Sequence, residues 1–187
     1  AAQGMDWARG QGIKVVNMSW SGLVGSQLVQ AAARNAHAAG MSCVASVGNG
    51  NSNTSIYYPA GYSKHVFAVN AFMPDGRRWQ DIDLPGGENS SRGSNYGNYI
   101  DMTAPGGRGI FTTKHHFNGS GYYDLSGLDP NNCENNDWLA ADGFSGTSAA
   151  APFVAGAIAA VLGHCSIVDG EDAQEIVRRT AVDHPFA

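Results

Sequence analysis

Charged residues are scarce in this sequence, and neither sign of charge forms a run. Lys and Arg number 11 and Asp and Glu number 16, so charged residues make up 14% of the chain, against about 25% in an average protein. The net charge of −5 is opposite to that of a nucleic-acid-binding surface or a polybasic membrane surface. We therefore expect no nucleic-acid partner.

Long hydrophobic runs are missing as well. The longest, Ala149 to Gly163, contains Pro152 and falls short of the roughly 18–20 residues that span a bilayer. We predict a buried helix there and no membrane span. The first residues include Asp6 and Arg9 and lack a continuous apolar core, so they do not have the pattern of a signal peptide.

Cysteine is rare and widely spaced. Cys43, Cys133 and Cys165 are the 3 cysteines, and their spacing fits neither a disulfide framework nor a Cys-x-x-Cys metal site. We predict buried free thiols.

What the chain does contain is glycine, 25 residues, and 43% hydrophobic residues, too many for a disordered chain. A length of 187 residues predicts a single domain over residues 1–187. Its long loops are expected at about 74–93 and 114–143.

Apolar runs alternate with helical patterns along the chain. Helices are predicted at 1–10, 26–39, 147–163 and 171–180, and strands at 13–20, 41–47, 66–71, 100–103 and 110–113. Strand, helix, strand with short links predicts an α/β fold, a parallel β-sheet with helices on both faces.

Ligands of such sheets bind beyond the carboxyl ends of the strands, where short polar segments occur in this sequence. Ser148 is expected at a helix N-terminus, which favours developing negative charge and suits a nucleophile. The alternative is that Thr147 or Ser148 only caps the helix. Asn49 could donate its amide to an oxyanion, or could simply be a turn residue between two glycines.

The order of several motifs is more specific than any one of them. Val15 to Gly22, Ala45 to Asn49, Tyr58-Pro59-Ala60, Val66 to Ala71, Ser94 to Gly106 and Gly146 to Gly156 follow one another along the chain. In this order and spacing they resemble the subtilisin-like serine proteases (subtilases). The resemblance implies a subtilisin-like three-layer α/β/α fold, incomplete at its N-terminal side.

The resemblance implies a serine endopeptidase acting on peptides or proteins. Ser148 would be the acylated nucleophile and Asn49 an oxyanion-hole donor. The segment Ser19-Trp20-Ser21-Gly22 would bind substrate as an added strand, and Ser46-Val47-Gly48 would form the facing wall of the specificity pocket. No cofactor is required for this chemistry.

Some positions depart from the family pattern. Ser21 and Val47 stand where the family more often has Gly and Ala, and Tyr57 is expected near the pocket floor. The added bulk predicts a preference for small or medium apolar side chains over large aromatic ones. Phe153 stands where the family often has His, and we expect it to pack.

The larger departure is that the family's Asp-Ser/Thr-Gly and His-Gly-Thr contexts do not occur. None of the histidines is followed by Gly; they are His37, His65, His115, His116, His164 and His184. We therefore expect the chain to be the C-terminal part of a catalytic domain, inactive without its missing N-terminal portion.

The sequence is compatible with one further function and excludes another. A pseudoprotease or peptide-binding module without a catalytic base stays open. An α/β-hydrolase is excluded, because no Gly-x-Ser-x-Gly elbow occurs.

The loop before Ser148 is rich in acids: Asp124, Asp129, Glu134, Asp137 and Asp142. A structural Ca²⁺ site and a solvated loop are both compatible with it, although no EF-hand spacing is present. By family resemblance we expect secretion.

Overall fold

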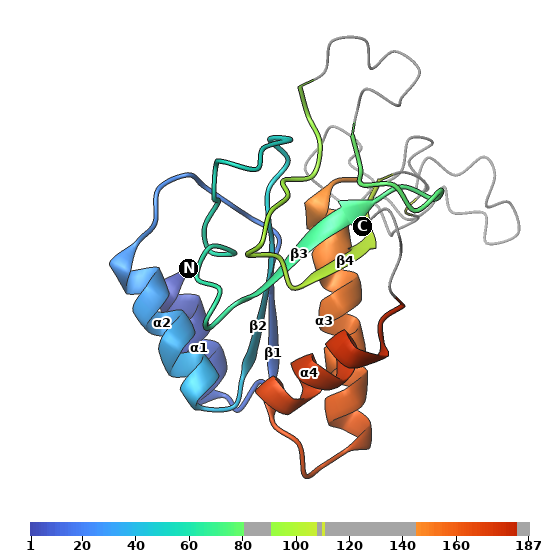
Figure 1. Ribbon diagram of the computed structural model, residues 1–187. Helices are drawn as coiled ribbons and strands as arrows, with labels where there is room; N and C mark the ends of the chain where they lie inside the picture. Colours follow the sequence, from blue (N-terminus) through green and yellow to red (C-terminus); the bar gives the residue numbers. More distant parts are fainter. Residues whose placement is uncertain (81–90, 108–109, 111–144, 183–187) are drawn as a thin grey trace, which may run out of the picture.

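The computed structural model describes residues 1–80, 91–107, 110 and 145–182. Its helices and strands follow one another in the expected order along the described residues (Figure 1). They are α1 (Ala2–Gly10), β1 (Val15–Met18), α2 (Gln27–Ala38), β2 (Ser42–Ser46), β3 (Phe67–Phe72), β4 (Met102–Pro105), α3 (Thr147–His164) and α4 (Gly170–Thr180). Most of the strand expected at 110–113 lies outside the described residues.

The strands form a 4-stranded parallel sheet in the order β1-β2-β3-β4. Val16 pairs with Cys43, and Ala45 with Ala68. Because the strands are parallel, their carboxyl ends lie along one edge of the sheet, where ligands of such sheets bind.

Helices cover both faces of this sheet, which confirms the predicted fold class (Figure 1). Small side chains of α1 and α2 pack on one face with Cys43, Ala45 and Ala68. The other face packs against α3 and α4 through Phe67, Val69 and others. The alternation of inward-facing residues along β3 is what divides the core into two layers.

Helix α2 has the ends that its sequence signals predict. The Ser26 Oγ accepts the Val29 N–H at 3.4 Å, as an N-cap does. Gly40 follows the helix with φ +73°, the left-handed conformation that glycine adopts without strain.

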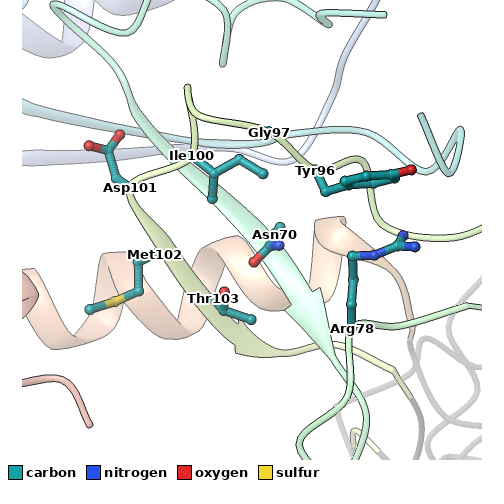
Figure 2. A pocket seen from close by; sticks show the side chains of 8 residues that line it. All are labelled: Asn70, Arg78, Tyr96, Gly97, Ile100, Asp101, Met102 and Thr103. Atoms are coloured by element: carbon teal, nitrogen blue, oxygen red, sulfur yellow. The ribbon is translucent and has the colours of Figure 1, made fainter. Parts of the chain in front are cut away.

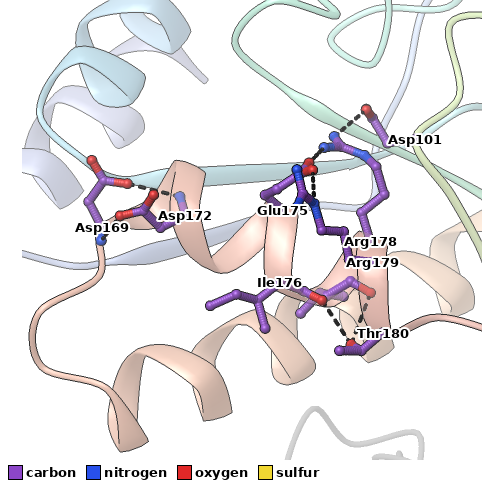
Figure 3. Close-up of polar contacts among 9 residues, drawn as sticks. Asp101, Asp169, Asp172, Glu175, Ile176, Arg178, Arg179 and Thr180 are labelled. Atoms are coloured by element: carbon purple, nitrogen blue, oxygen red, sulfur yellow. Dashed lines mark hydrogen bonds and ion pairs between the residues drawn. The ribbon is translucent and has the colours of Figure 1, made fainter.

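Polar contacts fix both ends of α4 (Figure 3). Asp169 and Asp172 form a reciprocal capping box, with the Asp172 N–H donating to Asp169 Oδ1 at 3.0 Å. Near the other end, Arg178 Nη2 donates to Asp101 Oδ1 at 2.8 Å. Asp101 Oδ2 accepts the Ala68 N–H, also at 2.8 Å, so this carboxylate ties α4 to β3.

The long helix α3 buries one face and exposes the other. Ala149 to Ala151 are buried against the sheet, whereas Phe153 is 49% exposed. Its length and apolar composition alone would allow a membrane span, and one of its faces packs against the sheet. The prediction of a buried helix is therefore correct for one face only.

The two cysteines among the described residues are free thiols, as predicted. Cys43 is buried in the core beneath α1 and α2, and this burial raises its pKa to about 11. Cys165 is only partly buried. Cys133 lies outside the described residues.

Candidate active site

Ser148 in the first turn of α3 meets Ser19, which follows β1. The Ser148 Oγ donates to the Ser19 carbonyl at 3.0 Å, and the Ser19 Oγ donates to the Ser148 carbonyl at 2.8 Å. The N-cap of α3 is Gly146, and no side chain caps the helix. The prediction that Thr147 or Ser148 serves only as a cap is therefore wrong.

The side chain of Asn49 is held by Thr147 in one orientation. Asn49 Oδ1 accepts the Thr147 N–H at 3.0 Å and the Thr147 Oγ1 hydroxyl at 2.7 Å. A backbone N–H can only donate, so the amide oxygen must face Thr147 and the Nδ2 group must point away from it. Nδ2 is thereby left to donate to another group.

Asn49 is not the left-handed residue of the loop that contains it. Positive φ angles fall instead on Gly48, at +95°, and on Asn51, at +50°. The side chain of Asn49 thus faces the α3 terminus from a loop whose strained positions are elsewhere.

Gly146 makes the approach of Asn49 to α3 feasible. It has φ +92° and ψ 178°, a conformation that is essentially restricted to glycine. A Cβ at this position would lie 2.8 Å from Asn49 Nδ2. The Gly146 N–H also donates to the Gly106 carbonyl at 2.5 Å, which seats the helix entry beside the end of β4.

The segment Ser19 to Gly22 has a partly open backbone. Gly22 pairs with Tyr58 through two backbone hydrogen bonds of 2.9 and 2.8 Å. The backbone groups of Trp20 and Ser21 have no partner within the part of the chain that the structure describes. Trp20 is 45% exposed. An extended peptide could pair with this edge.

On the facing side, Ser46 and Val47 are almost completely buried. Val47 packs in the core on the α1 and α2 face, and the Gly48 N–H donates to Thr147 Oγ1 at 3.2 Å. The side chain of Val47 therefore fills space in the core.

Comparison with known proteins places this arrangement in a family, since the subtilase family model matches residues 1–186. The chain belongs to the subtilase family. It is similar to thermitase of Thermoactinomyces vulgaris, 34% identical over 126 residues covering 67% of this chain and 39% of that protein. It is also similar to subtilisin DY of Bacillus licheniformis, 28% identical over 183 residues covering 96% of this chain and 54% of that protein. The chain thus spans about half the length of these relatives or less.

The fold of this subtilase chain is also similar to the crystal structure of a cold adapted subtilisin-like serine proteinase. The TM-score is 0.65 at 22% identity, with 98% of this chain and 54% of that chain covered. This likeness supports the fold.

The histidines of this subtilase that the structure describes lie away from Ser148. His37 and His65 lie near one another, with ring centroids 5.5 Å apart and the ring planes tilted by 52°, and His37 Nε2 lies 3.7 Å from Glu171 Oε2. Desolvation, followed by the charge of His37, lowers the pKa of His65. His164 is at the opposite end of α3, about 24 Å along the helix from Ser148 at roughly 1.5 Å per residue. His115, His116 and His184 lie outside the described residues.

A half-open pocket of about 440 Å³ lies on β3 and β4, and none of the residues singled out from the sequence as site residues lines it (Figure 2). The Arg78 guanidinium stacks on the Tyr96 ring at 4.2 Å, and burial lowers the pKa of Arg78. Asn70 is 5% exposed, and its Oδ1 has no hydrogen-bond partner among the described residues.

Metal ligands are not grouped in the described part of the chain. No three His, Cys, Asp or Glu side chains there could hold one ion together. The acids named for a Ca²⁺ site, from Asp124 to Asp142, lie outside the described residues.

Sequence reasoning missed the role of Thr147 toward Asn49, and it missed Asn95 altogether as a site residue. Asn95 is completely buried and bonds to the loop that carries Asn49. The only signal in the sequence was the position of Asn95 inside the Ser94-to-Gly106 motif.

Proposed function

We propose that this chain carries the nucleophile and oxyanion hole of a serine endopeptidase. Ser148 attacks the scissile carbonyl and forms an acyl-enzyme, and the developing oxyanion accepts hydrogen bonds from Asn49 Nδ2 and the Ser148 N–H. The observation that carries the proposal is the fixed amide of Asn49, whose oxygen is bound twice by Thr147. Its Nδ2 group is left beside the N-terminus of α3, where negative charge is favoured.

Substrate binding is proposed along Ser19-Trp20-Ser21-Gly22. The backbone groups of Trp20 and Ser21, which have no partner among the described residues, support a peptide added as a strand. Opposite it, Ser46-Val47-Gly48 would form the pocket wall. Because Val47 is buried, the preference for small or medium apolar residues rests on Ser21 and Tyr57. A peptide panel in which Phe is strongly preferred over Ala, Val or Leu would contradict it.

The general base is proposed to lie outside this chain, on the missing N-terminal portion of the same domain. Ser148 Oγ donates to a backbone carbonyl, and His37, His65 and His164 are not bonded to it. Two surfaces support a further portion of protein: β1 is at the edge of the described sheet, and Phe153 is exposed on α3. Without a base a serine hydroxyl is a weak nucleophile, so this chain alone should be inactive.

The second candidate is a pseudoprotease, or peptide-binding module, that keeps the groove but has no base in the whole protein. The Ser148 Oγ bond to Ser19, which needs no histidine, favours this alternative. An extracellular location is proposed from the family. A structural Ca²⁺ site is proposed among the acids from Asp124 to Asp142, which lie outside the described residues.

The decisive experiment is labelling with a fluorophosphonate, read by intact mass, with Ser148→Ala as the control. On the folded chain alone we expect no adduct. On the protein that also contains the upstream portion, we expect one adduct that Ser148→Ala removes. No adduct in either form would favour the pseudoprotease. An adduct on the chain alone, lost in Ser148→Ala, would show that a base is present within these residues or on a second copy.

A further inference from the structure

The loop that carries Asn49, residues 47–52, contains two residues with positive φ angles. We call it the oxyanion loop. Two of its residues have positive φ, Gly48 at +95° and Asn51 at +50°, and Asn51 is not a glycine. A non-glycine residue in this region costs free energy unless its surroundings impose it. Contacts from outside the loop would stabilise this conformation.

Asn95 contacts both ends of this loop. Its Nδ2 donates to the Val47 carbonyl at 2.8 Å, and its Oδ1 accepts the Ser52 N–H at 3.0 Å. Its own N–H donates to the Gly48 carbonyl at 3.0 Å. The residue is 0% exposed, so water cannot replace these bonds.

The glycines of the loop leave the space that Asn95 occupies. A Cβ at Gly48 would lie 2.8 Å from Asn95 Nδ2, and a Cβ at Gly50 would lie 3.2 Å from Asn95 Oδ1. The Tyr57 ring contacts the same two positions. The amide of Asn95 thus fills a site shaped by the loop itself.

Asn95 is in turn held by the sheet. The neighbouring residue Ser94 faces the other way, and its Oγ accepts the Ala71 N–H of β3 at 3.0 Å. Arg78 Nη1 donates to the Ser94 carbonyl at 2.5 Å and to Asn51 Oδ1 at 2.8 Å. Ser94 and Asn95 therefore connect the oxyanion loop to β3 in the core.

We propose that Asn95 is the positioning residue of the oxyanion hole, which sets the place of the Asn49 amide without touching the substrate. The inference rests on the proposed function of Asn49. A donor that is displaced by about 1 Å loses much of its effect on the reaction rate. Asn95 would therefore control kcat through Asn49, and its bonds to Val47 and Gly48 would also connect it to the proposed pocket wall, whereas it makes no bond to Trp20 or Ser21.

The first test needs no activity and uses this chain. The side-chain NH₂ signals of Asn49 are assigned in a ¹H–¹⁵N spectrum by their loss in Asn49→Ser. Asn95→Ala and Asn95→Asp should both shift or broaden the Asn49 signals, while the exposed Asn98→Asp should leave them in place. Asn95→Asp keeps an acceptor for Ser52 and serves if Asn95→Ala does not fold. Unchanged Asn49 signals in a folded Asn95 variant would overturn the proposal.

The second test uses the active protein that contains this chain. Asn95→Asp should lower kcat about tenfold and change KM by a smaller factor, a fraction of the roughly 10²–10³ attributed to one oxyanion-hole donor. In an Asn49→Ala background the same change should have little further effect. An equal loss in both backgrounds would overturn the role of Asn95 and leave the proposed function standing. Absence of hydrolysis in the unsubstituted protein would instead contradict the proposed function, with the spectra of the chain still deciding on Asn95.

Discussion

Thr147 holds Asn49 by two hydrogen bonds to one oxygen atom. Its backbone N–H reaches Asn49 Oδ1 at 3.0 Å and its hydroxyl at 2.7 Å, although 98 residues separate the two in sequence. Thr147 is completely buried, and its Oγ1 also accepts the Gly48 N–H at 3.2 Å. One threonine therefore joins the entry of α3 to the loop after β2.

Replacing Thr147 with Val should destabilise the chain while keeping its shape. The substitution removes the hydroxyl and leaves the buried Gly48 N–H without an acceptor, which costs about 1–3 kcal/mol of unfolding free energy. Thr147→Ser keeps the hydroxyl and is the matched control. Urea unfolding followed by circular dichroism measures both, and equal stability of the two variants would contradict the role assigned to the hydroxyl.

Gly146→Ala should destabilise the chain as well, for a different reason. Its φ of +92° with ψ of 178° is strained for alanine, at about 1–3 kcal/mol, and the new Cβ would meet Asn49 Nδ2 at 2.8 Å. Gly156→Ala is the control in the same helix, because nothing lies within 4 Å of its Cβ position. That variant should gain roughly 0.5–1 kcal/mol in urea unfolding. A neutral Gly146→Ala would argue against the tight approach of Asn49.

The sequence was sufficient to predict the sheet. It was also sufficient to predict that the polar segments after the strands lie close together. Periodicity and glycine stops placed the strands, and parallel strands necessarily bring Ser19 and Asn49 to one edge. Ser148 joins them because α3 begins at the same edge. These relationships depend on backbone direction, which local patterns determine well.

Side-chain partners could not be predicted in the same way. The bonds from Thr147 to Asn49 and from Asn95 to Val47 connect distant segments, and they depend on rotamers fixed only by tertiary packing. The bulk of the Val47 side chain was expected to narrow the pocket, yet this side chain packs in the core. The exposed face of α3 was also missed, because apolar composition does not show which face a neighbour covers.

The acid sensitivity of α4 should depend on Glu175. Hydrogen bonds from Arg179 and then Arg178 lower the pKa of this carboxyl below its ordinary value of 4.5. A depressed carboxyl pKa stabilises the fold above the unfolded pKa, and this contribution is lost as pH falls through the folded pKa. Unfolding from pH 7 to pH 3 should show a steeper loss for the native chain than for Glu175→Gln. The difference should vanish when Arg178 and Arg179 are both replaced by Met, and its persistence there would contradict the assignment.

Cys43 should resist alkylation as long as the chain is folded. The thiolate is the reactive form, and with burial raising the pKa of Cys43 to about 11, only about one thousandth of the thiol is ionised at pH 8. The partly buried Cys165 should react with iodoacetamide first. Peptide mapping by mass spectrometry at increasing urea distinguishes the two sites, and modification of Cys43 should follow the unfolding curve. Alkylation of Cys43 at the rate of Cys165 in native buffer would mean that the core beneath α1 and α2 opens without global unfolding.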